Sequence, residues 1–285
     1  NHRHTGIFHG FFCCRLIPHG SDDFSGIRNT TKWGTQEFRG GAGRLAQSSG
    51  ALGYYTQGTP TDDDWAARLW HPQALPYNQD WAAQVDVNLP NLTLSSNNMI
   101  ATGLFIFNQE DPDDNALVTL YRSKWGIGTN RKFEALMEVN GNDVLDVTPA
   151  TNSTQATVRL RWDAAAQTLY YEYDEDGPDA GGVTWKLLTS KPLNAGSSDW
   201  EMNAGSSFVV GLVTESENVA VAQADLVWLD NFKLAPLPKI TTHPLPQTVS
   251  LGGNTSFSVT ATPASGLTYQ WQKDGVDILG AISAT

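Results

Sequence analysis

Apolar and polar residues alternate along most of the chain, and the period of the alternation is two. In Asp80–Leu89 the side chains of Trp81, Val85 and Leu89 fall on one face and polar side chains fall on the other. This period is typical of a half-buried β-strand. Further strands are predicted at Met99–Phe107, Ala116–Arg122, Phe133–Val139, Val144–Val147, Ala156–Trp162, Leu169–Asp174, Val183–Leu188, Phe208–Val213 and Val219–Leu234. No segment keeps a 3.6-residue period, so the pattern predicts an all-β fold.

Strands joined by short turns of Gly, Asp, Asn and Pro can bury two apolar faces only when their sheets stack. We therefore predict a β-sandwich over residues 21–235. The segments Asp22–Ser25, Ala164–Tyr173 and Asp225–Leu234 resemble parts of concanavalin A-like and laminin G-like jelly rolls. The resemblance implies that the first and last strands of the sandwich are neighbours. Lectins, adhesion modules and glycan-cleaving enzymes all occur on this fold, so the fold does not choose among them.

The last part of the chain has a different pattern. Residues 236–239 form a Pro-rich linker, and residues 240–285 resemble the N-terminal half of an immunoglobulin-like domain of bacterial surface and secreted proteins. Trp271 lies 12 residues after Val259, which takes the place of the disulfide cysteine of antibody domains. The resemblance implies that Phe257, Val259 and Trp271 form the core of an immunoglobulin-like β-sandwich whose remaining strands, and further repeats, follow Thr285.

Charge and cysteine content narrow the class of protein. The formal net charge of −12 argues against a nucleic-acid partner, because an acidic surface is not attracted to phosphates. No apolar run is long enough to predict membrane insertion. The two cysteines, Cys13 and Cys14, are adjacent and cannot link distant strands. They lie in residues 1–20, which we interpret as a disordered or non-native leader.

A strand with alternating carboxylates is the catalytic candidate. Glu172 and Asp174 are two residues apart, so a strand would place both on one face. Carboxyl groups about 5 Å apart suit a retaining glycosidase. The alternative is a structural hairpin whose Leu169, Tyr171 and Tyr173 pack inward, and the similarity to the noncatalytic hairpin of laminin G-like modules favours it.

Two kinds of binding residue are candidates. Asp111, Asp113 and Asp114 crowd one loop with hard oxygen ligands, so Ca²⁺ is a possible cofactor. Acidic turn residues that only maintain solubility are the alternative. Trp70 and Trp125 are the choices for a carbohydrate site, because sugars present flat C–H faces to indole rings. The alternative is that both rings cover the sandwich core or its edges.

These features lead to three functional hypotheses. The first is a noncatalytic module of a secreted or cell-surface bacterial protein that binds a polysaccharide or surface glycan, or acts in adhesion. A glycoside hydrolase or polysaccharide lyase on the same fold is the alternative. A purely structural spacer is the third. All three place the chain outside the cell or at the cell surface.

Overall fold

The computed structural model describes residues 15–16, 20–34, 38–70, 74–125, 128–177, 184–194, 199–222, 226–236, 239–248, 250, 253–262, 267–273 and 276–284. The chain divides into two units. One is Gly20–Leu234, and the other combines Asn1–His19 with Ala235–Thr285. No helix in the described ranges is both long enough and apolar enough to cross a membrane.

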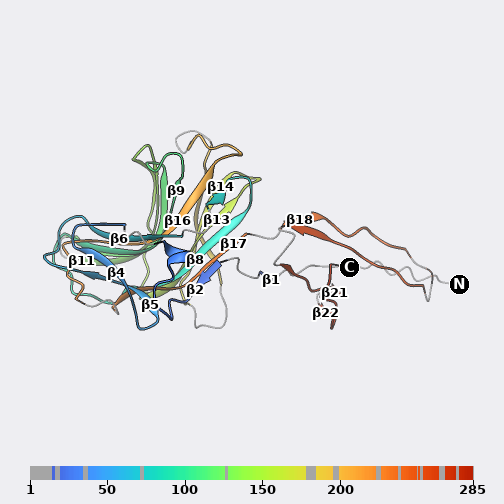
Figure 1. The fold of residues 1–285 in the computed structure, drawn as a ribbon, viewed down its shortest axis with the longest axis horizontal. Helices are drawn as coiled ribbons and strands as arrows, with labels where there is room; N and C mark the ends of the chain where they lie inside the picture. Colours follow the sequence, from blue (N-terminus) through green and yellow to red (C-terminus); the bar gives the residue numbers. More distant parts are fainter. Residues whose placement is uncertain are drawn as a thin grey trace. The chain divides into compact units, whose positions relative to one another are not determined.

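Two antiparallel sheets form the unit Gly20–Leu234 (Figure 1). The front sheet, as we call it, has the order β12 (Asn142–Val147), β11 (Gly128–Val139), β10 (Asn115–Trp125), β9 (Asn98–Asn108), β16 (Ser207–Glu217), β6 (Asp64–Leu69) and β3 (Phe38–Gly40), with β7 (Leu75–Pro76) beside β16. The back sheet has the order β15 (Lys186–Pro192), β14 (Thr168–Asp174), β13 (Gln155–Asp163), β8 (Trp81–Asn88), β17 (Val227–Pro236), β5 (Ala51–Thr56) and β4 (Gly43–Ser48), with β2 (Gly20–Asp22) beside β17. A short helix, α1 (Thr30–Trp33), is capped by the side chain of Asn29.

The core lies between the two sheets and follows from the alternation in the sequence. In β8 the side chains of Trp81, Ala83, Val85 and Val87 are all buried. Trp162 of β13 is the register partner of Trp81 and is also fully buried. Burial of such side chains is the main favourable contribution to the stability of the sandwich. The core cluster extends through both sheets within this unit.

The predicted all-β sandwich is confirmed. The chain crosses between the sheets from β8 to β9, from β12 to β13 and from β16 to β17, as the winding of a jelly roll requires. Asp22 of β2 is opposite Phe232 of β17, so the first and last strands of the sandwich are neighbours, as the resemblance implied. The predicted hairpin also forms, although its second strand, β15, begins at Lys186 and continues to Pro192.

The second unit contains short strand pairs. β1 (Arg15–Leu16) pairs with β20 (Leu267–Thr268), β18 (Lys239–Thr242) with β19 (Thr260–Thr262), and β21 (Gln272–Lys273) with β22 (Val276–Asp277). Val259 and Trp271 are buried, and the ring centroid of Phe257 lies 6.1 Å from that of Trp271. The immunoglobulin-like assignment stays a prediction. Most of the predicted leader and part of the predicted linker, at 1–14, 17–19 and 237–238, lie outside the described residues.

Candidate functional site on the front sheet

Strand register brings side chains from distant parts of the chain into one row on the outer face of the front sheet. Across β11, β10, β9, β16 and β6, the successive partners are Lys132, Tyr121, Ala101, Glu215 and Trp65. Their chain neighbours Phe133, Leu120, Ile100 and Ala66 are buried in the core. Because side chains alternate along a strand, the row itself points away from the core. We call Trp65, Glu134, Glu215 and Glu217 the outer-face site.

Trp65 is held in a defined position. Its half-buried indole lies across Gly40 of β3, and a Cβ on Gly40 would come within 2.2 Å of the indole Nε1. Asp64, the residue before it, is buried and accepts hydrogen bonds from the backbone of Ala42 at 2.7 Å and of Thr61 at 2.8 Å. Buried carboxylates that accept several backbone hydrogen bonds fix a loop strongly. The indole is therefore placed by the fold before any ligand arrives.

Glu215 is the most perturbed carboxyl group of this face. Loss of solvation, followed by the charges of Glu134 and Glu217, raises its pKa to about 7. The side chain keeps part of its surface exposed, and no hydrogen bond or ion pair joins it to another residue in the described parts of the chain. A carboxyl group of this kind can donate a proton to a ligand or accept a hydrogen bond from it near neutral pH.

Glu134 has partners on its own face. Lys132 lies 3.2 Å from it, and the Thr119 hydroxyl donates to it at 3.4 Å. The Lys132 ammonium also sits 4.1 Å from the ring centroid of Tyr121. Burial raises the pKa of Glu134 despite the nearby lysine. The Lys132 ammonium group thus already has an ion-pair partner on β11 and an aromatic partner on β10.

Glu217 continues the acidic row along β16. It follows Glu215 by two residues and therefore shares its face. Partial burial, and then the charge of Asp62, raises the pKa of Glu217. The outer-face site thus combines an aromatic ring with several carboxyl groups that resist ionisation.

The predicted catalytic pair lies elsewhere, on the outer face of the back sheet. Arg159 Nε donates to the Glu172 carboxylate at 2.6 Å, and Arg161 Nη2 donates to it at 3.2 Å. The two guanidinium groups stack on Trp185 and Tyr170, at 3.7 Å and 3.8 Å from the ring centroids. Both oxygens of Glu172 are therefore engaged by arginine, and neither is free to attack a sugar.

Asp174 is also committed to the fold. It is buried and accepts hydrogen bonds from the backbone of Asp176 at 3.3 Å and of Thr184 at 3.0 Å. Leu169 and Tyr171 are fully buried, as the structural alternative predicted. The contacts of Glu172 and Asp174 therefore fit the structural interpretation that the sequence favoured, because their partners hold together β13, β14 and the β14–β15 hairpin.

The two tryptophans predicted to bind sugar have different outcomes. Trp70 is only 7% exposed. Its ring packs edge-on against Trp33 at 5.1 Å and lies 5.0 Å from Phe232. The sugar-binding prediction for Trp70 is therefore corrected, because both neighbours cover the ring and leave it in the core. The side chain of Trp125, at the end of β10, lies outside the described parts of the structure.

The predicted calcium ligands do not converge. Asp114 is buried and accepts a hydrogen bond from Asn140 N at 2.9 Å, while Asp111 accepts one from Asp113 N at 3.2 Å. Burial raises the pKa of Asp114. Among the described residues, no group of three or more His, Cys, Asp or Glu side chains is arranged to hold a metal ion. The three-carboxylate site is therefore corrected, since Asp111 and Asp114 accept hydrogen bonds from backbone N–H groups of their own loop and of the β11–β12 turn.

The same loop borders a polar cavity of about 250 Å³. It is lined by Asn108, Glu110, Asp111, Asp114, Asn140, Asp199, Trp200, Glu201, Asn203 and Ser206. Asn108 donates a hydrogen bond to the Trp200 carbonyl at 3.2 Å, and Trp200 Nε1 donates to the Glu138 carbonyl at 3.0 Å. Residues that line the cavity thus form hydrogen bonds that join the ends of β9 and β11 to the segment around Trp200.

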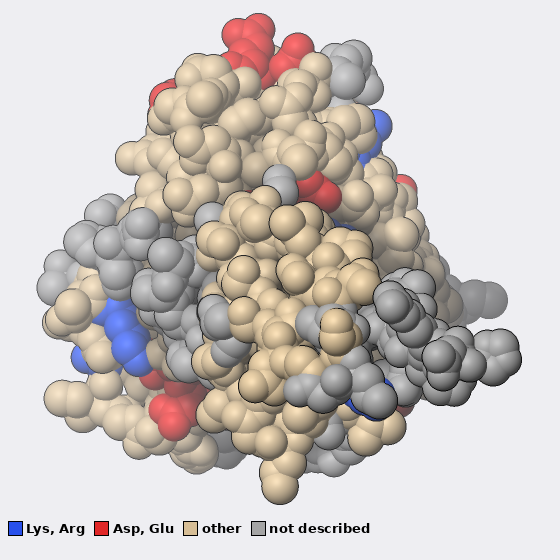
Figure 2. Space-filling view, turned by 90° about the vertical axis from the view of Figure 1, so that its right-hand side faces the viewer, with Lys and Arg blue, Asp and Glu red and all other residues tan. Residues whose placement is uncertain are grey.

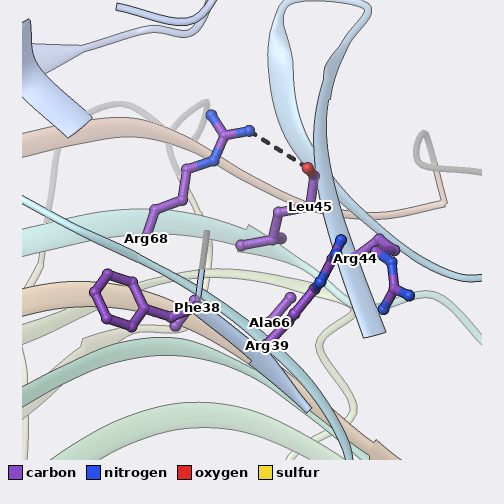
Figure 3. Close-up of a pocket in the computed structure, with 7 residues that line it drawn as sticks. Phe38, Arg39, Arg44, Leu45, Ala66 and Arg68 are labelled. Carbon is purple, nitrogen blue, oxygen red and sulfur yellow. Dashed lines mark hydrogen bonds between the residues drawn. The ribbon is translucent and has the colours of Figure 1, made fainter. Parts of the chain in front are cut away.

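A much smaller cavity of about 10 Å³ lies beside the buried Arg68. Figure 3 shows the Arg68 guanidinium turned toward the Leu45 carbonyl, to which Nη2 donates at 3.3 Å. This volume is comparable to the space that one water molecule needs. It is too small for a sugar. Figure 2 shows one face of the molecule, on which the charged residues drawn in colour form small patches among uncharged ones.

The outer-face site was missed in the sequence, although one signal was present. Glu215 and Glu217 continue the alternation of the strand predicted at Phe208–Val213, with Thr214 before them and Ser216 between them. Extending that strand by four residues would have placed both carboxylates on its outer face. Their proximity to Trp65 depends on strand pairing, which alternation alone does not reveal.

Comparisons with known proteins give weak structural likenesses. No family model and no curated protein matches the chain. The Bacteroides ovatus xyloglucan PUL protein GH43B is 14% identical, with a TM-score of 0.48 over 76% of this chain, which spans only 39% of that protein. The potassium-bound carbohydrate recognition domain of Emp46p is 9% identical, with a TM-score of 0.47 over 75% of this chain and 94% of that domain. Griffonia simplicifolia lectin I-B4 in its metal-free form is 13% identical, with a TM-score of 0.44 over 76% of this chain and 99% of the lectin. At these scores, the fold assignment rests on the strand topology described above.

Proposed function

We propose that this protein binds a glycan chain on the outer face of the front sheet. Trp65 stacks on one sugar ring, and Glu215 forms hydrogen bonds with the hydroxyl groups beside it. One observation carries the proposal. A half-buried indole lies directly across the strand pair from a carboxyl group that has no protein partner in the described residues.

The chemistry of the row suits a sugar. Sugars combine an apolar C–H face with hydroxyl groups at the ring edge, so they need an aromatic surface with a polar group close by. Gly40 and Ala101 flank Trp65 and Glu215 in the same row. Their small size leaves the two larger side chains free of bulky neighbours in that direction.

The test uses titration of the full chain with linear hexasaccharides, namely cellohexaose, laminarihexaose, xylohexaose and chitohexaose. Trp65→Ala is compared with Trp185→Ala, a matched control on the back sheet whose half-buried ring stacks on Arg159. We expect at least one hexasaccharide to bind and Trp65→Ala to weaken it about tenfold, which corresponds to about 1.4 kcal/mol. Trp185→Ala should retain wild-type affinity. Equal losses in both variants, or no binding by any hexasaccharide, would overturn the proposal.

Glycoside hydrolysis is the second candidate function. Its candidate catalytic residues now lie on the front sheet instead of at Glu172. Glu215, with its pKa near 7, and Glu217 share one face of β16. A protonated carboxyl group beside a second carboxylate is the pair that glycoside hydrolysis uses. Release of reducing ends by the wild type, and its loss in both Glu215→Gln and Glu217→Gln, would support this activity. Binding without turnover would favour the noncatalytic module.

The proposal also includes the location of the protein outside the cell or at its surface. A secreted or cell-surface bacterial protein is supported by the sequence resemblance of residues 240–285 to immunoglobulin-like repeats. In that setting the sandwich would serve as the glycan-binding or adhesive unit. The spacer hypothesis would gain support if neither binding nor turnover were found across the hexasaccharides.

A further inference from the structure

We propose that the glycan bound at the outer-face site carries free amino groups, and that an ammonium group of an amino sugar pairs with Glu215 beside Trp65. This inference rests on the proposed glycan-binding function and names the class of ligand. It makes the site selective for cationic polysaccharides over neutral and anionic chains of the same length.

The charged groups that raise the pKa of Glu215 are all carboxylates. After loss of solvation, the groups that act on it are the carboxylates of Glu134, Glu217, Asp63 and Glu138. They come from β11, from β16 itself and from the loop that leads into β6. An isolated carboxylate crowded by others is unfavourable, so a cation placed among them gains free energy that a neutral group does not.

Lys132, the basic residue on the outer face of the described strands of this sheet, does not supply that cation. Lys132 is paired with Glu134 at 3.2 Å and covers the Tyr121 ring. Arg122 of β10 donates a hydrogen bond to the backbone carbonyl of Leu92, and Arg131 of β11 donates one to that of Leu89. Both guanidinium groups thus bind backbone carbonyls, and neither forms an ion pair with Glu215.

Trp65 completes the cation site. An ammonium group within about 6 Å of an indole centroid is attracted to the face of the ring. Trp65 is the direct register partner of Glu215, so one amino sugar can stack its ring on the indole and direct its ammonium group to the carboxylate. An anionic sugar in the same place would meet like charges, which is unfavourable.

Proton release is a direct consequence of this pairing. At pH 6 the Glu215 carboxyl group is largely protonated, because its pKa lies at about 7. An arriving ammonium group favours the ionised form, so binding expels a proton to the buffer. A neutral sugar that uses Glu215 as a hydrogen-bond partner does not require this release.

The experiment compares two hexamers that differ in charge, the hexamer of glucosamine and the hexamer of N-acetylglucosamine. The full chain is titrated by calorimetry at pH 6 in two buffers of different ionisation enthalpy, at low and high salt. We expect the glucosamine hexamer to bind at least about tenfold more tightly, to lose affinity with salt and to release protons. Glu215→Gln should bring the two affinities together. Asp113→Asn, an exposed carboxylate on the loop between β9 and β10, is the matched control and should keep the preference.

The outcomes separate this inference from the proposed function. Equal binding of both hexamers, or a preference that persists in Glu215→Gln, would overturn the amino-sugar assignment and leave glycan binding in place. Binding of the glucosamine hexamer without proton release would also overturn the pairing with Glu215. Absence of binding by these hexamers and by the uncharged hexasaccharides would overturn both proposals.

Discussion

Trp65 and Glu215 face each other directly across the β6–β16 strand pair, although 150 positions separate them in the sequence. On the other side of β6, Gly40 lies beneath the indole. The three residues therefore form one row across β3, β6 and β16: the glycine leaves room for the ring on one side of β6, and the carboxyl group lies on the neighbouring strand at the other side.

Gly40→Ala should weaken glycan binding without a change at Trp65 itself. The new methyl group would lie 2.2 Å from the indole Nε1, so the ring must leave the position that it takes across Gly40. We expect a loss of about tenfold in affinity and about 1 kcal/mol or more in stability from overpacking. Titration with the hexasaccharide that binds the wild type most tightly measures the first effect, and urea unfolding measures the second. Gly26→Ala is the control, because no atom beyond its own chain neighbours lies within 4 Å of the added methyl group.

Glu215 should make stability fall as the pH rises toward neutrality. Its pKa of about 7 in the folded protein lies above the ordinary value of 4.5, so the folded state holds a proton that the unfolded chain has lost. The resulting stabilisation is full below about pH 4.5 and disappears as the pH passes 7. A shift of this size corresponds to at most about 3 kcal/mol, and partial exposure of the side chain reduces that value.

Urea unfolding of the wild type and Glu215→Gln between pH 4 and pH 8 tests this sign. The variant should be more stable than the wild type at pH 8 by about 1–3 kcal/mol, and the difference should shrink toward pH 4.5. Asp230→Asn is the comparison, since the pKa of Asp230 is raised by burial to about 6. Its difference from the wild type should be complete about one pH unit below the point at which the Glu215→Gln difference is complete. A Glu215→Gln difference that does not depend on pH would contradict the assignment.

Glu172→Gln should reduce stability and leave the binding site intact. The carboxylate accepts charged hydrogen bonds from Arg159 and Arg161, and the three side chains are mostly buried. Loss of the charge leaves two guanidinium groups without their counter-ion, at a cost of about 2–3 kcal/mol. Urea unfolding and a double-mutant cycle with Arg159→Met measure the coupling. Unchanged stability together with lost sugar turnover would restore the catalytic interpretation of this strand.

The parts of the fold that could be predicted are those in which local alternation decides the structure. In β8, β13 and β14 apolar core side chains alternate with mostly polar ones, and all three strands were predicted close to their observed bounds. β4, β5 and β6 were not predicted. In β6 the buried position 68 is an arginine, whose Nη2 donates to the Leu45 carbonyl, so the apolar pattern is broken by a residue that the interior accommodates.

The site was harder to predict because it depends on register. Alternation correctly placed Glu172 and Asp174 on one face of β14, but it could not show that Arg159 is the cross-strand partner of Glu172. The same limit hid the pairing of Glu215 with Trp65. Which residues meet across a sheet is set by the pairing of whole strands, and this information is not local in the sequence.

Trp70→Ala separates a core tryptophan from a sugar-binding one. The ring packs against Trp33 and Phe232 and is 7% exposed, so its removal creates a cavity in the sandwich. We expect a loss of about 3–5 kcal/mol in the free energy of unfolding, measured by urea denaturation at low temperature. Under conditions in which the variant is still folded, its affinity for the hexasaccharide should match that of the wild type, whereas Trp65→Ala should show the opposite pattern of small stability loss and weakened binding. If Trp70→Ala instead lost binding at unchanged stability, the indole would be available to ligand and the sugar-binding role first inferred for Trp70 would be correct.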